Sequence, residues 1–303
     1  MLVSCGCQSQ TATRPAESKR MSTPSTRGQP FTLTYTSSGG PELGPSLYER
    51  QTSLTIKSAD RSVVLEQHRS ESDEAGAPIG MFRLAADPES LQKLLEYAVE
   101  ERLGDLAPPA RGGPGTSVMT IALEMDDRKI SKMLTSGDIP QIGQLEYFLY
   151  QLNQIMFAAR QAPYQAVRVT VAADLPAHRF VVGIENIGKA NVCLFDPLTI
   201  GSGGPDRWIG VRLAELPQEI PGVTSPPLEW SEIHVQPQSG PPRIVTLKAG
   251  ERLTMPPTSW ANPRKGIKYL VQGVWSDYAP SVRSEDCYFM RGAAFSDNLT
   301  VAP

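Results

Sequence analysis

After residue 30, apolar and polar side chains alternate in short runs. Residues 31–36, 51–56 and 62–65 have the period of two that is typical of half-buried β-strands. A polar turn separates the second run from the third, and residues 81–84 form another short run after an acidic segment that contains Gly and Pro. The pattern predicts an antiparallel meander at the start of the folded chain.

The next segment has a helical period instead. Asp87, Pro88 and Glu89 form a helix start, because Asp can accept backbone N–H groups, Pro needs no partner at the first position, and Glu favours the positive end of the dipole. One apolar face follows, made of Leu91, Leu94, Leu95, Ala98 and Val99. The acidic residues of this segment fall between the apolar positions, which indicates a solvated face rather than a metal site.

A hairpin and a second helix complete this part of the chain. Residues 117–134 are predicted to be two strands on either side of a turn that contains Asp126 and Asp127. We interpret the Asp pair as turn residues, since no further oxygen ligands for a hard cation stand in register with it. Residues 145–159 carry a continuous apolar stripe, which predicts a helix packed on the sheet. Residues 31–164 are therefore expected to form an α+β domain, with two helices on one face of an antiparallel sheet.

The rest of the chain is predicted to be all β. Its central feature is residues 180–195, two apolar runs joined by an Asn-Ile-Gly-Lys turn, which we interpret as a hairpin. Further apolar runs bounded by turns continue to the C-terminus without a convincing amphipathic helix. The pattern predicts an all-β immunoglobulin-like sandwich over residues 165–303. A chain of 303 residues is long enough for two domains, each with its own core.

Composition agrees with a β-rich protein that has many turns. The chain contains 27 Pro and 25 Gly, which favour short elements over long helices. Its formal net charge is −3 and no segment forms a basic stripe, which argues against nucleic acid as a partner because phosphate binding depends on clustered Lys and Arg. No apolar run approaches the roughly 20 residues of a membrane-spanning helix.

The N-terminal residues have the composition of a tether. Residues 2–5, Leu-Val-Ser-Cys, resemble the lipobox of bacterial lipoproteins, in which the cysteine, here Cys5, is lipidated. The following residues are rich in Ser, Thr, Pro, Gln and basic side chains. The resemblance implies an uncharacterised bacterial envelope lipoprotein, extracytoplasmic and lipid-anchored or secreted, in which residues 1–30 are a disordered tether. An ordinary disordered tail is the alternative interpretation.

Two cysteines lie in the part of the chain that is predicted to fold, Cys193 and Cys287. In an oxidising compartment they would form a disulfide that closes a loop of roughly 94 residues, which stabilises a fold by about 4 kcal/mol on the chain-entropy model. The alternative is two buried free thiols. Neither cysteine has a neighbouring His or Gly-rich turn that would lower its pKa, so a catalytic nucleophile is not predicted.

No pattern along the chain indicates catalysis, a cofactor or a bound metal. The three histidines, His68, His178 and His234, stand apart from each other and from any nucleophile in the sequence. This leaves neither metal-ligand spacing nor a recognisable triad. We therefore expect a non-enzymatic protein without catalytic, cofactor-binding or metal-binding residues.

A proline-rich stretch, residues 214–242, is the predicted contact loop. It contains Pro226 and Pro227 close to Trp230, and long loops whose prolines restrict their freedom are frequent binding sites. A structural lid over one end of the sandwich is the alternative. An exposed Trp230 and an exposed Trp260 would also allow stacking on sugars.

The layout of the chain has two resemblances to protease inhibitors. The Ser-Gly-Gly sequence of residues 38–40, followed by helix, hairpin and helix, is similar in order to emfourin-type proteins, bacterial inhibitors of thermolysin-like metalloproteases. The Asn-x-Gly turn, the Ala-Gly-Glu of residues 249–251 and the Gly-x-x-Tyr of residues 266–269 are similar to the bacterial intracellular proteinase inhibitor fold. The resemblances imply protease inhibition. The acidic excursion in residues 67–80 departs from the emfourin pattern, and no inhibitory residue carries over.

Together these patterns predict an envelope-associated, non-enzymatic binding protein that acts through protein–protein contacts. The expected partner is a protein, for instance a protease, and membrane contact occurs only through the lipid anchor. The alternatives are a protease inhibitor, a structural lipoprotein and a carbohydrate-binding module.

Overall fold

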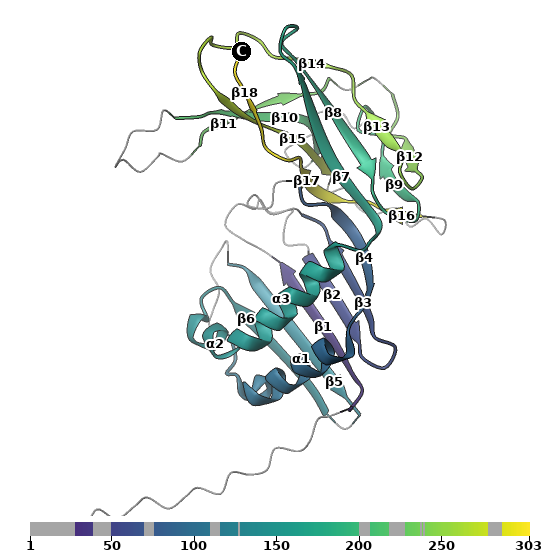
Figure 1. Cartoon of the computed structure of the whole chain (residues 1–303), viewed down its shortest axis with the longest axis vertical. Helices are drawn as coiled ribbons and strands as arrows, with labels where there is room; N and C mark the ends of the chain where they lie inside the picture. The colour runs from purple at the N-terminus through teal and green to yellow at the C-terminus, as the bar shows by residue number, and fades with distance from the viewer. Residues whose placement is uncertain are drawn as a thin grey trace, which may run out of the picture.

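The computed structural model describes residues 28–38, 50–69, 76–109, 116–126, 128–199, 207–217, 228–236, 238, 240–277 and 287–303. The fold is β-rich and built mainly from antiparallel sheets, with few helices (Figure 1). Within these residues, no helix is both long enough and apolar enough to cross a membrane.

The helices are α1 (Pro88–Glu100), α2 (Ile139–Gln144) and α3 (Glu146–Arg160), and a short 3-10 helix, η2, spans Leu103–Asp105. The strands of the first half are β1 (Phe31–Ser38), β2 (Arg50–Lys57), β3 (Ser62–Gln67), β4 (Ile79–Ala85), β5 (Val118–Met125) and β6 (Arg128–Thr135). Those of the second half are β7 (Pro163–Asp174), β8 (Arg179–Asn186), β9 (Val192–Phe195), β10 (Arg207–Glu215), β11 (Trp230–His234), β12 (Ile244–Leu247), β13 (Arg252–Thr254), β14 (Thr258–Ser259), β15 (Tyr269–Asp277), β16 (Tyr288–Phe289), β17 (Gly292–Phe295) and β18 (Leu299–Val301).

One ten-stranded sheet runs through both halves of the molecule. Its order is β13-β8-β7-β4-β3-β2-β1-β5-β6, with β14 also paired to β8. The halves are joined where β4 pairs with β7, with Ile79 opposite Val167 and Gly80 opposite Ala166. The predicted boundary between residues 164 and 165 therefore falls near the start of β7, inside a continuous sheet.

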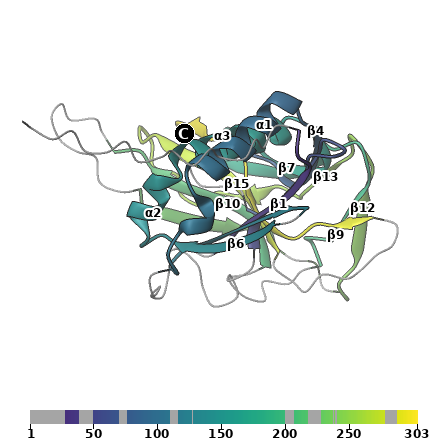
Figure 2. The same cartoon turned by 90° about the horizontal axis from the view of Figure 1, so that it is seen from below.

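The first half is a helix layer on a sheet. Helices α1 and α3 lie on one face of the strands β1 to β6 (Figure 1), and the view from below shows them as a separate layer (Figure 2). The α1 start is as the sequence predicts: Asp87 accepts a hydrogen bond from the Ser90 backbone N–H at 2.9 Å, and Pro88 is the first helical residue. This cap satisfies one of the N–H groups that the first turn leaves without an intrahelical acceptor.

Replacing Asp87 with Ala is expected to lower the free energy of unfolding by about 1 kcal/mol, the usual effect of losing an N-cap. Urea denaturation followed by circular dichroism measures the change. Lys93→Ala is the matched control, since the ion pair of Lys93 with Glu89 in the same helix is exposed and such pairs contribute little. Equal stability of the Asp87→Ala variant and the wild type would contradict the role of the cap.

Two apolar cores lie along the molecule. The first is enclosed by the helices and the sheet of the first half, and its largest side chains include Phe82 and Phe148. The second lies between β7–β8 and a five-stranded sheet of order β11-β10-β15-β17, with β18 beside β15, and it contains Phe180 and Trp275. A small third sheet, β12-β9-β16, adds side chains of β9 to the second core.

The predicted hairpin of residues 180–195 is wrong. β8 pairs with β7 and β13, whereas β9 belongs to the small third sheet with β12 and β16. The reason is Asn186, whose side chain is fully buried and donates to the carbonyl oxygens of Ala190 at 3.0 Å and Leu247 at 2.9 Å. Its Oδ1 accepts from the Gly188 N–H at 2.9 Å. These bonds turn the chain out of one sheet and into another instead of back along β8.

Candidate interaction surface

Helix α3 has two apolar faces. One is buried in the first core and consists of Phe148, Leu152, Ile155, Met156 and Ala159. The other faces solvent and carries Tyr147, Tyr150 and Phe157, each 61 % exposed. Spacings of three and seven residues place these three aromatic side chains on one stripe of a helix, opposite the buried face. We call these three residues the α3 aromatic stripe.

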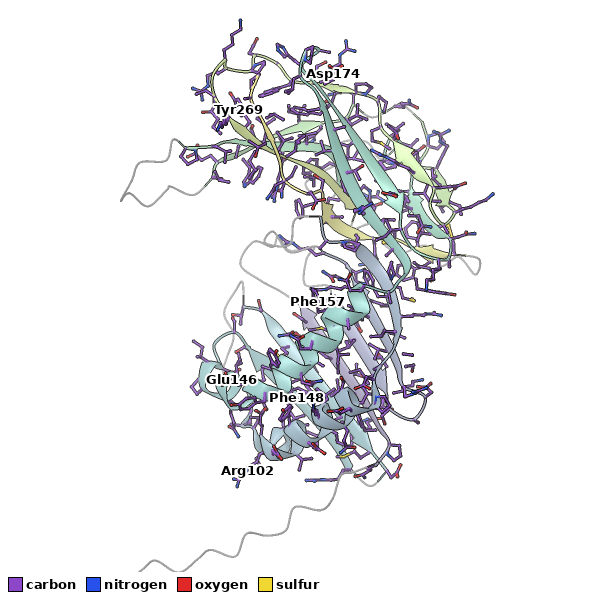
Figure 3. All side chains as sticks on the ribbon, viewed as in Figure 1. Arg102, Glu146, Phe148, Phe157, Asp174 and Tyr269 are labelled. Atoms are coloured by element: carbon purple, nitrogen blue, oxygen red, sulfur yellow. A yellow bond between two sulfur atoms is a disulfide. The ribbon has the colours of Figure 1, made fainter. Side chains whose placement is uncertain are left out.

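Between its two ends, the exposed face of α3 carries no charged side chain. The exposed residues of α3 between Glu146 and Arg160 are Tyr147, Tyr150, Asn153, Gln154, Phe157 and Ala158. Figure 3 shows Glu146 near one end of the helix and Phe157 near the other, towards the second half of the molecule. Enrichment in aromatic side chains and depletion of charge distinguish the centre of a protein interface from the remaining surface.

The N-terminal end of the stripe is held in place by α1. The Glu101 carboxylate, just after α1, accepts hydrogen bonds from the backbone N–H groups of Tyr147 and Phe148, both at 2.9 Å. These are orphan donors of the first turn of α3, where Leu145 offers no side-chain cap. The ring of Tyr97 in α1 also lies against the Tyr147 ring, with centroids 5.8 Å apart. The surface is therefore pre-ordered, which reduces the entropy lost on binding.

Phe157 stands between two hollows at the C-terminal end of the helix. The first, about 590 Å³, is lined by Tyr35, Thr52 and Gln154 among others. The second, about 510 Å³, is lined by Pro78, Pro163 and Arg168 among others, and so reaches the junction of the two halves. Phe157 and Arg160 line both hollows. An exposed aromatic ring flanked by concave surface is a suitable contact point for a partner protein.

A third hollow, about 610 Å³, opens at one end of the second core. Its apolar wall contains Leu213, Leu228 and Ile267. Among its polar groups, the Glu215 carboxylate accepts from the Tyr269 hydroxyl at 3.4 Å and forms an ion pair with Arg264. Glu229 and Ser231 also line the hollow, so it offers a ligand polar as well as apolar contact.

Of the four predicted contact residues, the structure describes Trp230 and Trp260. Pro226 and Pro227, like Cys5, lie outside the described residues. Trp230 is half-buried at the start of β11, with the Arg212 guanidinium 4.4 Å above its ring. The expectation that Trp260 is exposed is wrong.

Trp260 is buried because its backbone follows β14, which pairs with β8 over the second core. The residue is only 6 % exposed, and its backbone N–H donates to the His178 carbonyl oxygen at 2.8 Å. The indole packs against the rings of Phe180 at 5.4 Å and Tyr269 at 4.7 Å between centroids. It is a core residue and cannot stack on a sugar.

The outer face of β10 and β11 also lacks a flat aromatic platform. Trp208 and His234 stack on each other with centroids 4.7 Å apart and planes 14° apart. Each of the two rings therefore covers a face of the other. Arg212 is held between Trp230 and Phe295, 4.4 and 4.2 Å from their ring centroids. The aromatic faces there are used within the protein, which disfavours a carbohydrate-binding surface.

Cys193 and Cys287 form a disulfide, with their Cα atoms 5.8 Å apart. The bond attaches β16 to β9, and these two strands pair in parallel. The Met290 N–H also donates to the Cys193 carbonyl oxygen at 2.6 Å. The disulfide therefore fixes the chain just before it crosses to the junction between the two halves.

Within the part of the chain that the structure describes, none of the three histidine rings contacts another histidine or the side chain of a Ser or Cys. His68 lies at the junction with its Nδ1 3.3 Å from the Arg291 carbonyl oxygen, and burial lowers its pKa below the ordinary value. His178 occupies a left-handed turn position, and His234 lies 3.2 Å from Glu232 on the surface. Each of them has a structural environment that explains its presence.

The α3 aromatic stripe is the feature that the sequence interpretation missed. The pattern at 147, 150, 154 and 157 is visible in the chain, but the sequence analysis predicts only the apolar stripe that faces the core. A second stripe on the opposite face of the same helix is the signal that points to this surface. The sequence matches no known protein-family model, and it has no significant similarity to a curated protein.

Proposed function

We propose that this chain is a non-enzymatic binding protein that acts through protein–protein contacts at the α3 aromatic stripe. The observation that carries the proposal is the exposure of three aromatic side chains, each 61 %, on one uncharged helix face. Single exposed apolar residues are ordinary, but a contiguous group of them marks an interaction site. The proposal is supported by the hydrogen bonds that the first turn of α3 donates to Glu101 and by the two hollows beside Phe157.

The proposal extends to the organisation and location of the chain. In it, residues 31–164 are an α+β unit that presents the stripe, and residues 165–303 are an immunoglobulin-like sandwich that supports it. The two separate apolar cores support this division. An extracytoplasmic place in a bacterial envelope, with Cys5 as lipid anchor, is supported by the disulfide, since such bonds persist in oxidising compartments.

Photocross-linking at the stripe tests the proposal. A photoreactive amino acid at Gln154, which lies between Tyr150 and Phe157 on the exposed face, is expected to cross-link a discrete protein in the envelope fraction. The double variant Tyr150→Ser/Phe157→Ser is then expected to bind the purified partner with an affinity at least about 30-fold lower than that of the wild type. The reason is that losing central aromatic contacts costs about 2 kcal/mol or more.

The matched control is Ile244→Ser, which removes a side chain that is 47 % exposed on β12 in the other half. This variant is expected to bind with unchanged affinity. Equal binding of the partner by the wild type and the Tyr150→Ser/Phe157→Ser variant would contradict the proposal.

Protease inhibition is the narrower version of this function and rests on the two layout resemblances. A full-chain protein at micromolar concentration is assayed against metalloproteases and serine proteases. Inhibition that is lost in the Tyr150→Ser/Phe157→Ser variant would identify a protease as the partner. If neither class of protease is inhibited, protease inhibition is excluded and the proposal of a protein-binding function stands.

A further inference from the structure

The exposed face of α3 is nearly symmetric along its length. Tyr147 and Phe157 lie five residues on either side of position 152, and Tyr150 and Gln154 lie two residues on either side of it. The flanking Gln151 and Asn153 are both amides. A helix face with nearly the same pattern in both directions can pack against a second copy of itself in antiparallel orientation, since a two-fold interface places the same patch on both subunits.

The contacts of such a pair follow from this symmetry. Each Tyr147 ring would meet Phe157 of the second copy, and each Tyr150 would meet Gln154. Both aromatic pairs lie at the ends of the contact and exclude water from the amides at its centre. Offset or edge-to-face packing of two rings contributes about 1 kcal/mol beyond the burial of their area.

Charge favours the antiparallel orientation over the parallel one. Glu146 is the acidic residue of the first turn of α3, and Arg160, whose Nε donates to Gln67 Oε1 at 2.9 Å, is the basic residue of its last turn. Antiparallel alignment brings Glu146 of one copy towards Arg160 of the other at both ends, whereas parallel alignment would bring like charges together. No charged side chain interrupts the exposed residues between them.

We propose that the partner at the α3 aromatic stripe is a second copy of this chain, packed antiparallel across α3 as a two-fold dimer. The inference rests on the proposed function because it uses the same surface. A helix of 15 residues is about 22 Å long, and one such contact buries less area than a standard interface. The dimer is therefore expected to be weak and to form in the micromolar range.

A pair of complementary variants tests the register. Phe157→Glu places a carboxylate against Tyr147 twice in its own dimer, and Tyr147→Lys places an ammonium against Phe157 twice. In a mixed dimer, one end keeps the native Tyr147–Phe157 contact and the other end pairs the new Glu with the new Lys. Sedimentation velocity of the full chain is expected to show a concentration-dependent dimer for the wild type and monomers for each variant alone. An equimolar mixture of the two variants is expected to recover the dimer.

The controls separate misfolding and a different partner from the proposed dimer. Circular dichroism confirms that both variants remain folded, and Ile244→Glu, on β12, is expected to dimerise like the wild type. A wild type that stays monomeric up to hundreds of micromolar, or a mixture that stays monomeric although each variant is folded, would overturn the dimer. In either case, loss of binding to a cross-linked partner in the Tyr150→Ser/Phe157→Ser variant would leave the proposed function standing.

Discussion

A variant with Ser in place of both Cys193 and Cys287 is expected to lose about 4 kcal/mol of the free energy of unfolding. The disulfide joins residues that are 94 positions apart, and a cross-link over so long a loop strongly restricts the unfolded chain. The folded state loses order as well, because the pairing of β16 with β9 covers only two residues and is too short to hold β16 in place without the disulfide.

The loss is expected to concentrate where the cross-linked segment meets the rest of the fold. Beyond the disulfide, the Ala293 N–H donates to the His68 carbonyl oxygen at 2.9 Å. Hydrogen exchange of the variant should therefore accelerate first in residues 287–296 and at the end of β3. This pattern would distinguish a loosened junction from a uniform loss of stability.

Guanidinium denaturation without reductant measures the change in the free energy of unfolding. Wild type in the presence of reductant should match the Cys193→Ser/Cys287→Ser variant, because both lack the cross-link. Cys7→Ser is the matched control, since it removes a cysteine outside the described residues and keeps this disulfide. A difference below about 1 kcal/mol between the wild type and the Cys193→Ser/Cys287→Ser variant would contradict the stabilising role.

The elements that the sequence predicts well are those whose signals are local. The N-cap of α1 and its apolar face need only a dozen neighbouring residues, and α1 begins and ends close to where they indicate. The runs at residues 31–36, 51–56 and 62–65 lie within β1, β2 and β3 for the same reason. Helix α2 was not predicted, because Pro140 and Gly143 weaken its local signal and it buries none of its side chains.

The features that the sequence does not predict depend on contacts between distant residues. The pairing of β4 with β7 joins residues about 85 positions apart, and no local pattern specifies which strand lies beside which. The burial of Trp260 likewise depends on the rings of Phe180 and Tyr269. A tryptophan in a Pro-rich region has the same local pattern whether its ring faces the core or solvent.

The α3 aromatic stripe shows the same limit for the candidate site. Local periodicity gives the helix and two apolar stripes on it, but only the packed structure decides which stripe is buried. Phe148 and Leu152 face the sheet with at most 1 % exposure, and this leaves Tyr150 and Phe157 in solvent. A site defined by what remains exposed can be identified only after the core has been assigned.

Replacing Asn186 with Ala is expected to lower the free energy of unfolding by about 3 kcal/mol. The side chain is fully buried and makes three hydrogen bonds to backbone groups, and its loss leaves those groups without a partner in a place that water does not reach. The bond to Leu247 spans 61 residues, so the variant also loses a link between the turn after β8 and the end of β12.

The position of Asn186 explains why this turn takes the chain from one sheet to another. The Gly188 N–H donates a hydrogen bond to Asn186 Oδ1. A Cβ at Gly188 would come within 2.5 Å of the Tyr164 carbonyl oxygen. The turn at residues 186–190 therefore packs against Tyr164 of β7 on one side and is hydrogen-bonded to Leu247 on the other. Urea denaturation measures the loss, and Lys189→Ala, an exposed change in the same turn, is expected to leave the stability within about 0.5 kcal/mol. An Asn186→Ala variant as stable as Lys189→Ala would show that the loop holds its path without these bonds.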